Sequence, residues 1–340
     1  MKKIVVTGGL GFIGSHTVVE LQNSGFKVVI IDNLSNTTMS VLDGIVSITG
    51  KTPDFYNIDL KDKQDVETFF KTHSDIAGVI HFAASKAVGE SVNEPLMYYE
   101  NNINTLVYML QNTSQLKQAP FIFSSSCTVY GEAQELPISE TSPIQPALSP
   151  YGNTKQIGEE IISDLCKADA SFNAIALRYF NPIGAHESAK IGELPLGVPQ
   201  NLVPFITQTG AGIREQLSVF GDTYNTEDGT CIRDYIHVVD LAKAHVIALK
   251  RLMDGENSRN YEVFNLGTGQ GSSVLEVIKS FERVSNQPLN YKVVDKREGD
   301  VVAAYADTTK AKEVLKWTAK STLDDAMLSA WKWQQRLKKD

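Results

Sequence analysis

The first half of the chain alternates short apolar runs, rich in β-branched residues, with amphipathic stretches. Such runs are typical of parallel strands buried on both faces, and the stretches between them are typical of helices that cover a sheet. This order predicts an α/β fold with a doubly wound parallel sheet, which binds ligands at the carboxyl ends of its strands. The expected strands are Lys3–Val6, Lys27–Asp32, Asp54–Ile58, Gly78–Phe82, Phe121–Ser124 and Asn173–Tyr179, and the expected helices are Gly14–Gln22, Asp65–Lys71, Asn101–Gln115 and Tyr151–Cys166.

The pattern changes after about residue 180. Glycine and proline become frequent between Asn181 and Pro204, and the regular alternation weakens. We therefore expect residues 1–180 to form a Rossmann domain and residues 181–340 to form a smaller, irregular, mixed α/β domain. The stretch Asp234–Leu266 again reads as a helix followed by a strand, and we expect it to return partly to the first sheet.

Composition and charge exclude several classes of function. The 340 residues carry a net charge of −8, which argues against a nucleic acid or an anionic membrane as the main partner. No apolar run is long enough to span a bilayer, and the start has no signal-peptide pattern. The three cysteines are widely spaced, so we expect free thiols in a cytoplasmic protein. The six histidines show no ligand spacing with acids or cysteines, so we expect no metal site.

A glycine-rich turn joins the first expected strand to the first expected helix. Gly8, Gly11 and Gly14, with Gly9 between them, form two overlapping glycine patterns at this junction. Glycine permits a tight turn and a close approach of the backbone to a pyrophosphate, which the helix N-terminus at Phe12 and Ile13 attracts. Elsewhere the same glycines would indicate only a tight turn, but at this junction they predict dinucleotide binding.

An acidic residue ends the second expected strand. Asp32 lies at the spacing of a ribose-binding acid, and Asn33 follows it. A carboxylate there accepts hydrogen bonds from ribose hydroxyls and repels a 2′-phosphate, so the cofactor is expected to be NAD rather than NADP. A turn aspartate that merely caps the strand is the alternative. Asp59 and Leu60 end the third strand and are expected to border the adenine.

Ser126, Tyr151 and Lys155 are the candidate catalytic residues. Ser149 and Pro150 read as an N-cap and a first helical residue, so Tyr151 begins a helix and Lys155 follows one turn later on the same face. A tyrosine has a pKa of about 10, and a nearby ammonium or the positive nicotinamide lowers it.

Such a tyrosinate can take a proton from a substrate hydroxyl while a hydride leaves the carbon. Ser126 would hydrogen-bond the same oxygen, and Lys155 would also hold the nicotinamide ribose. The alternative is that the serines simply end a strand and Tyr151 packs at the surface.

At these residues the chain resembles the extended short-chain dehydrogenase/reductase family and, within it, the UDP-glucose 4-epimerases. The resemblance covers nearly the whole chain. The segments that carry it are Asp32–Asn36, His81–Val92, Tyr179–His186, Thr226–Gly229, Arg233–Val238 and Arg297–Asp300.

The resemblance implies that UDP-glucose and UDP-galactose are interconverted through a transient NAD-dependent oxidation at C4. Tyr151 would remove the O4 proton, the 4-keto sugar would turn about its diphosphate link, and NAD would stay bound through many turnovers. Residues 181–340 would bind the UDP-sugar. A homodimer would form through the helices at Pro95–Gln115 and Lys155–Lys167.

The resemblance also implies roles for individual residues outside the glycine turn. Phe82, Ala83, Lys86, Asn101 and Tyr179 would help to hold NAD, together with Tyr151 and Lys155. Arg233 and Arg297 would neutralise the diphosphate, as suits guanidinium geometry, although surface ion pairs are their alternative. The other substrate contacts would be Lys86, Ser126, Tyr151, Asn181, Asn201, Leu202, Ser218, Phe220, Tyr235 and Asp300.

One position departs from part of this family. Some glucose-specific members carry a tyrosine four residues after the aspartate that matches Asp300, and this chain has Ala304 there. An alanine leaves room for an N-acetyl group at C2. We therefore expect UDP-N-acetylglucosamine and UDP-N-acetylgalactosamine to be substrates as well.

Two other functions share some of these residues. A nucleotide-sugar 4,6-dehydratase or a decarboxylase would carry acids near Val129–Gly131, but Cys127 and Thr128 stand there. A non-enzymatic NAD-binding module would keep the glycine turn without needing Tyr151 and Lys155. Cys127 also resembles a nucleophile by its position, but no base is evident for it, so a small buried thiol is expected.

Overall fold

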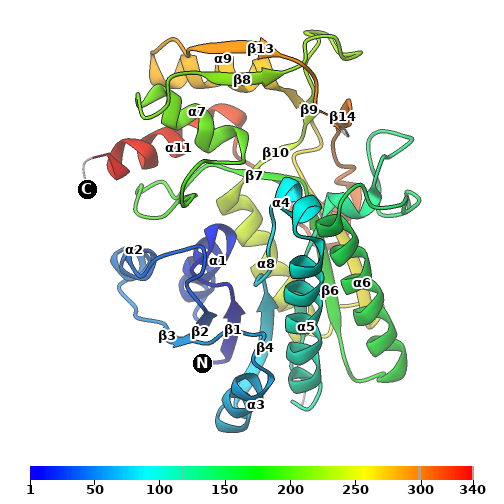
Figure 1. Cartoon of the computed structure of the whole chain (residues 1–340). Coiled ribbons are helices and arrows are strands. Elements are labelled where there is room, and N and C mark those ends of the chain that lie inside the picture. The colour runs from blue at the N-terminus through cyan, green and yellow to red at the C-terminus, as the bar shows by residue number, and fades with distance from the viewer. Residues whose placement is uncertain (117, 298–299, 339–340) are drawn as a thin grey trace.

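A seven-stranded parallel sheet forms the centre of the larger part of the molecule (Figure 1), as seen in a computed structural model that describes residues 1–116, 118–297 and 300–338. Its strand order is β11-β6-β5-β4-β1-β2-β3, and all neighbouring strands are parallel. The strands are β1 (Lys3–Thr7), β2 (Lys27–Asp32), β3 (Asp54–Asn57), β4 (Ile76–His81), β5 (Phe121–Ser126), β6 (Ala174–Tyr179) and β11 (Tyr261–Leu266). Strands β2 and β3 are added on one side of β1, and β4 and the strands after it on the other side. This change in strand order between β1 and β4 marks the ligand-binding switch point of such sheets.

Successive residues of each strand face opposite sides of the sheet, and both sides are buried. Ile4 and Val6 of β1 lie in one apolar cluster, and Val5 between them lies in the other. Apolar residues therefore fill these strands without alternation. The helices of this part are α1 (Phe12–Asn23), α2 (Ser40–Thr49), α3 (Lys63–Thr72), α4 (Val88–Asn93), α5 (Pro95–Thr113), α6 (Pro150–Ala168) and α8 (Val238–Met253), with a 3-10 turn, η1, at Cys127–Tyr130.

A smaller part lies above the carboxyl edge of this sheet in Figure 1. Helices α7 (Leu202–Gly210), α9 (Val274–Ser285) and α11 (Leu323–Leu337) pack with the strand pair β8 (Leu217–Phe220) and β13 (Tyr291–Val294) around a core that includes Phe281 and Trp331. Helix α10 (Thr309–Val314) packs against β11. The remaining short strands are β7 (Asn181–Ile183), β9 (Ile232–Arg233), β10 (Tyr235–His237), β12 (Ser272–Ser273) and β14 (Ala303–Ala304).

The α/β class and the doubly wound sheet are confirmed. After α8 the chain re-enters the first sheet as β11, which pairs with β6 along its length. The division into domains at residue 180 stays a prediction. Among the described residues, no helix is long and apolar enough to cross a membrane.

Several predicted element boundaries were wrong. Strand β5 continues to Ser126, because its last two serines pair with Arg178 and Tyr179 of β6. Helix α5 begins at Pro95, as expected for the proposed dimer helix, and not at Asn101, where the helical pattern was first placed. The second half is also more regular than predicted: α9 and α11 both begin with capping boxes, in which a hydroxyl and an acid satisfy the first amides.

Candidate active site

The glycine turn brings the backbone of β1, α1 and β4 into close contact. Gly8 has a φ of 64°, and an added Cβ there would lie 2.9 Å from the backbone nitrogen of Ala83. A Cβ on Gly14 would lie 2.1 Å from the carbonyl oxygen of Gly8. Gly11 is the N-cap of α1 and provides no side-chain cap, so the amides of the first turn, from Phe12 and Ile13, have no side-chain acceptor. This cradle fits a pyrophosphate, which supplies the missing acceptors.

Asp32 ends β2 beside the glycine turn. Its carboxylate accepts hydrogen bonds from the amides of Leu10, at 3.1 Å, and Leu34, at 3.0 Å. Burial raises the pKa of Asp32, and these two amides oppose the shift. The side chain is thus a fixed acceptor beside the turn, which fits a ribose. Asn33 next to it is exposed.

The other predicted cofactor residues lie around the carboxyl ends of the strands. Asp59 accepts from the amide of Lys61, while Leu60 is buried beneath the sheet. Phe82 and Ala83 follow β4, and the amide of Ala83 donates to Thr7 Oγ1 at 3.2 Å. Asn101 donates to Ser85 Oγ, and Tyr179 is hydrogen-bonded to Ser124. Their contacts to a cofactor stay predictions.

The three candidate catalytic residues meet at the junction of β5 and α6. Ser149 caps α6 by accepting from the amide of Gly152 at 3.1 Å, which sets Tyr151 in the first turn. Ser126, at the end of β5, lies close enough to the Tyr151 hydroxyl to lower its pKa. Lys155 Nζ donates to the carbonyl oxygen of Ser124 at 2.7 Å and lies 5.8 Å from the centre of the Tyr151 ring.

Burial governs the electrostatics of this group. It raises the pKa of Tyr151 to about 12, against the hydrogen bond from Ser126, which lowers it. It also lowers the pKa of Lys155 to about 8, against the negative charge of Glu159, which raises it. The expectation that Lys155 and the bound nicotinamide lower the pKa of Tyr151 stays a prediction, and burial acts against it.

The predicted diphosphate residues gather around the short strands of the second half. Arg233 on β9 lies 3.6 Å from Asp300, measured from Nη2 to Oδ1, and Ala304 on β14 pairs with Arg233 in register. The Arg297 guanidinium lies 3.7 Å from the ring centre of Phe220 on β8. Two members of the predicted Arg297–Asp300 motif, Glu298 and Gly299, lie outside the described residues.

The remaining predicted substrate residues lie on β7, β8, β10 and α7. Asn181 pairs with Tyr235 across β7 and β10, and β7 follows β6 directly in the chain. Burial raises the pKa of Tyr235 well above its ordinary value. Ser218 lies on β8, and Leu202 begins α7.

Glu193 is a residue of this region that the sequence did not predict. Its Oε1 accepts from Asn201 Nδ2 at 2.6 Å and lies 3.6 Å from Lys86 Nζ. It thereby joins a predicted cofactor residue of the first half to a predicted substrate residue of the second half. Glu193 lies in a loop without periodicity, so no sequence signal identified it.

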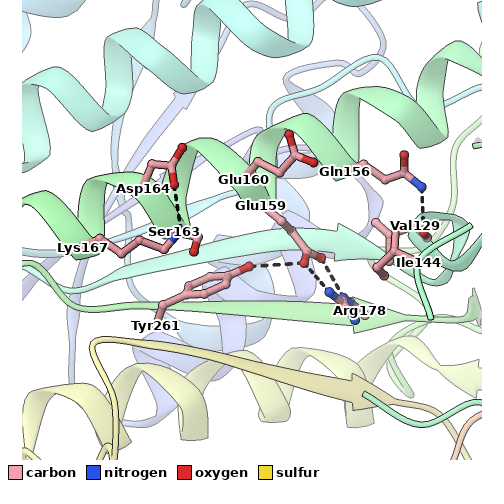
Figure 2. Close-up of a pocket in the computed structure, with 10 residues that line it drawn as sticks. All are labelled: Val129, Ile144, Gln156, Glu159, Glu160, Ser163, Asp164, Lys167, Arg178 and Tyr261. Atoms are coloured by element: carbon pink, nitrogen blue, oxygen red, sulfur yellow. Dashed lines mark hydrogen bonds and ion pairs between the residues drawn. The ribbon is translucent and has the colours of Figure 1, made fainter. Parts of the chain in front are cut away.

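A buried ion pair between Glu159 and Arg178 was also missed (Figure 2). Its signal was present, because Arg178 is a charged residue inside the otherwise apolar strand β6. The pair lines a pocket of about 320 Å³ that runs along α6 from Gln156 to Lys167, beyond Tyr151 and Lys155.

The cysteines and histidines supply no further chemistry in the described ranges. Cys127, Cys166 and Cys231 are free thiols, as predicted. Burial raises the pKa of the Cys127 thiol to about 12, so it is a poor nucleophile. In the described ranges, no group of three or more His, Cys, Asp or Glu could hold a metal ion.

Comparison with known proteins decides the family. A family model described as GDP-mannose 4,6 dehydratase matches residues 5–329. The UDP-glucose 4-epimerase of Bacillus subtilis is 48% identical over 331 residues, which cover 97% of this chain and 96% of that protein. The chain belongs to the UDP-glucose 4-epimerase family, within the extended short-chain dehydrogenases/reductases.

Solved structures of the family agree with this fold throughout. The Stenotrophomonas maltophila enzyme, with bound NAD and formylated UDP-arabinopyranose, is 43% identical with a TM-score of 0.95, covering 100% of this chain and 99% of that chain. The UDP-Glc/GlcNAc 4-epimerase from Campylobacter jejuni is 35% identical with a TM-score of 0.85, covering 99% and 100%.

The dehydratase chemistry in the family model's description is not matched by the residues beside Tyr151. Thr128 and Cys127 occupy the place where a dehydratase would carry acids, and the Thr128 hydroxyl is buried without a hydrogen-bond partner among the described residues. Water elimination needs a proton donor and acceptor there, and neither residue supplies one.

Proposed function

We propose that this chain is a UDP-hexose 4-epimerase that interconverts UDP-glucose and UDP-galactose with NAD as a retained cofactor. The observation that carries the proposal is the meeting of Ser126, Tyr151 and Lys155 at the same carboxyl edge of the sheet as an α1 N-terminus that lacks a side-chain cap. NAD is the cofactor of the Stenotrophomonas structure. Asp32 favours NAD over NADP, because its carboxylate would repel a 2′-phosphate.

The chain's own residues bind, orient and move a proton. When bound, NAD supplies reversible oxidation at C4 of the sugar. Tyr151 takes the proton from the sugar O4 and later returns it, while Ser126 hydrogen-bonds the same oxygen. Lys155 provides a positive charge that stabilises the phenolate and holds the nicotinamide ribose. Because burial raises the pKa of Tyr151 to about 12 despite the opposing effect of Ser126, this charge matters for producing the base.

The second half would hold the UDP group while the sugar turns. Arg233 and Arg297 would neutralise the diphosphate, and Asp300 would accept from the uridine ribose. Backbone groups of β8 near Ser218 and Phe220 would meet the uracil. In this proposal residues 1–180 with β11 form the NAD-binding domain, and the rest of 181–340 forms the UDP-sugar-binding domain.

The test is turnover without added cofactor. The purified protein is incubated with UDP-galactose, and the 4-epimer is followed by NMR, with Tyr151→Phe as the variant and Tyr99→Phe as a matched control from neighbouring α5. We expect wild-type and control to form UDP-glucose and Tyr151→Phe to lose at least about 10²-fold in kcat. A 4-keto-6-deoxy product, or no product even with added NAD, would contradict the proposal.

We further infer that the enzyme accepts N-acetylated UDP-sugars. Ala304 is a small, partly buried residue in register with Arg233, so it lies beside the proposed diphosphate site. The Campylobacter relative is named for both substrate types. We expect Ala304→Tyr to abolish turnover of UDP-N-acetylgalactosamine and to spare UDP-galactose, with Ala304→Ser as the control. Failure of the wild-type enzyme on the N-acetylated substrate alone refutes this inference and leaves 4-epimerisation intact.

We also infer a cytoplasmic homodimer that pairs through α5 and α6. Apolar side chains are exposed at the start of this surface: Leu96, at the start of α5, is 81% exposed, and Val92, on the preceding helix α4, is 61% exposed. Sedimentation of the purified protein should give twice the mass of the 37.4 kDa chain. Leu96→Glu should shift the species toward the monomer mass.

A further inference from the structure

The buried pair of Glu159 and Arg178 is fully hydrogen-bonded. Arg178 donates to Glu159 through Nε at 2.8 Å and Nη2 at 2.5 Å, a bidentate arrangement. Glu159 also accepts from Ser125 Oγ at 2.5 Å and from Tyr261 at 3.2 Å. The third guanidinium nitrogen of Arg178 donates to the Tyr130 hydroxyl at 2.9 Å.

These bonds join every element that carries the candidate catalytic group. Ser125 precedes Ser126 on β5, Tyr130 lies in η1 directly after it, and Arg178 lies on β6. Glu159 lies on α6, one turn after Lys155. Figure 2 shows α6 above β6, with the carboxylate pointing down onto the guanidinium and Tyr261 reaching it from β11. No other ion pair between buried side chains in the described residues touches this group.

Lys155 is surrounded by few other ionisable groups. From α6 it faces Glu159 and Tyr151, and from β4 it faces His81, whose pKa burial lowers to about 3. Tyr179 of β6 lies nearby through its bond to Ser124, and burial raises its pKa. Glu159 is therefore the negative charge next to the Lys155 ammonium, because both tyrosines and the histidine are neutral near pH 7.

We propose that the Glu159–Arg178 pair is a positioning element of the active site, which holds the end of β5 and the first turns of α6 so that Lys155 and Ser126 stay in place. The Glu159 carboxylate supports the Lys155 ammonium, and the two hydrogen bonds from Arg178 hold that carboxylate in its orientation. This inference rests on the proposed function for its meaning in catalysis, but the Lys155 ammonium can be measured without turnover.

Another buried Arg–Glu pair among the described residues is a matched control. Arg251 donates to Glu262 through Nε at 2.8 Å and Nη2 at 3.1 Å, and Glu262 also accepts from Ser258. Its side chains are as buried as those of Glu159 and Arg178. It joins α8 to β11 and has no bond to the catalytic group.

The experiment compares Glu159→Gln with Glu262→Gln. The proteins are labelled with ¹³C at lysine Cε, the Lys155 signal is assigned by its loss in Lys155→Met, and its titration is followed by NMR. The wild-type signal should titrate near pH 8. Glu159→Gln should lower this midpoint by about one unit, because a nearby opposite charge has been removed, and Glu262→Gln should leave it unchanged. The alkaline limb of kcat against pH should move in the same direction in Glu159→Gln alone.

A double variant keeps the inference testable if Glu159→Gln fails to fold. Glu159→Gln/Arg178→Met removes both charges, so no buried charge is left unpaired. It should also lower the Lys155 midpoint, since the Glu159 carboxylate is the charge that raises the pKa of Lys155. A midpoint equal to wild type in every folded variant overturns the inference, even when stability falls. Absence of epimerase activity in the wild-type protein would refute the proposed function instead.

Discussion

Three buried histidines should make the stability of this protein sensitive to mild acid. His16 on α1, His81 at the end of β4 and His245 on α8 are each at most 2% exposed. Burial lowers the pKa of His16 and His81 to about 3 and that of His245 to about 4. Among the described residues, Nε2 of His16 and of His245 has no hydrogen-bond partner, so no acceptor would stabilise a second proton on either ring.

The sign of the effect follows from proton binding. An unfolded histidine has a pKa of about 6.5, so below this pH the unfolded chain takes up protons that the folded chain does not. The free energy of unfolding therefore decreases as the pH falls below about 7. At pH 5.5 each histidine contributes a loss of about 1.4 kcal/mol relative to pH 7.5, and the three together about 4 kcal/mol. Carboxyls whose pKa burial raises, such as Asp32 and Glu140, oppose this change, because they take up protons in the folded state.

A variant isolates the contribution of one histidine from these opposing groups. His245→Leu removes the titrating ring and leaves the carboxyls in place. The free energy of unfolding is measured by urea denaturation at pH 7.5 and pH 5.5, and the loss between them should be smaller by about 1.4 kcal/mol than in wild type. Val246→Ala, on the same helix, should lower stability at both pH values and keep the wild-type pH dependence. If His245→Leu keeps the whole wild-type pH dependence, the reasoning is refuted.

Three further predictions concern the proposed active site. Gly14→Ala should reduce the amount of NAD that copurifies with the protein, because the added Cβ would lie 2.1 Å from the carbonyl oxygen of Gly8. The released NAD is measured by absorbance of the supernatant after the protein is denatured. Gly89→Ala is the control and should retain NAD, because a Cβ there meets nothing within 4 Å. Ser126→Ala should lower kcat about 10²-fold and move the acid limb of the plot of kcat against pH to higher pH, because Ser126 lowers the pKa of Tyr151. An acid limb at the wild-type pH would contradict this. Arg297→Gln should raise KM for UDP-galactose about tenfold with little change in kcat, measured by initial rates, and an unchanged KM would place the diphosphate elsewhere.

The sequence by itself determined the features that depend on neighbouring residues in the chain. The strands of the first half were recognisable because both of their faces are buried, which requires continuous apolar runs. The glycine turn was recognisable because its tight backbone contacts require glycine at fixed positions. At position 14, for example, any Cβ would collide with the carbonyl oxygen of Gly8. The start of α6 was recognisable from Ser149 and Pro150, a local cap that sets Tyr151 and Lys155 one turn apart.

Only the tertiary structure decided the contacts between distant residues. The strands of the second half are mostly two to four residues long, too short to show any periodicity, so their pairing around Arg233 and Ala304 could not be predicted. Glu159 and Arg178 meet only because β6 lies next to β5 beneath α6. The pKa of Tyr151 likewise depends on how deeply the fold buries its hydroxyl, and burial is set by the packing of elements far apart in the chain, which no local pattern encodes.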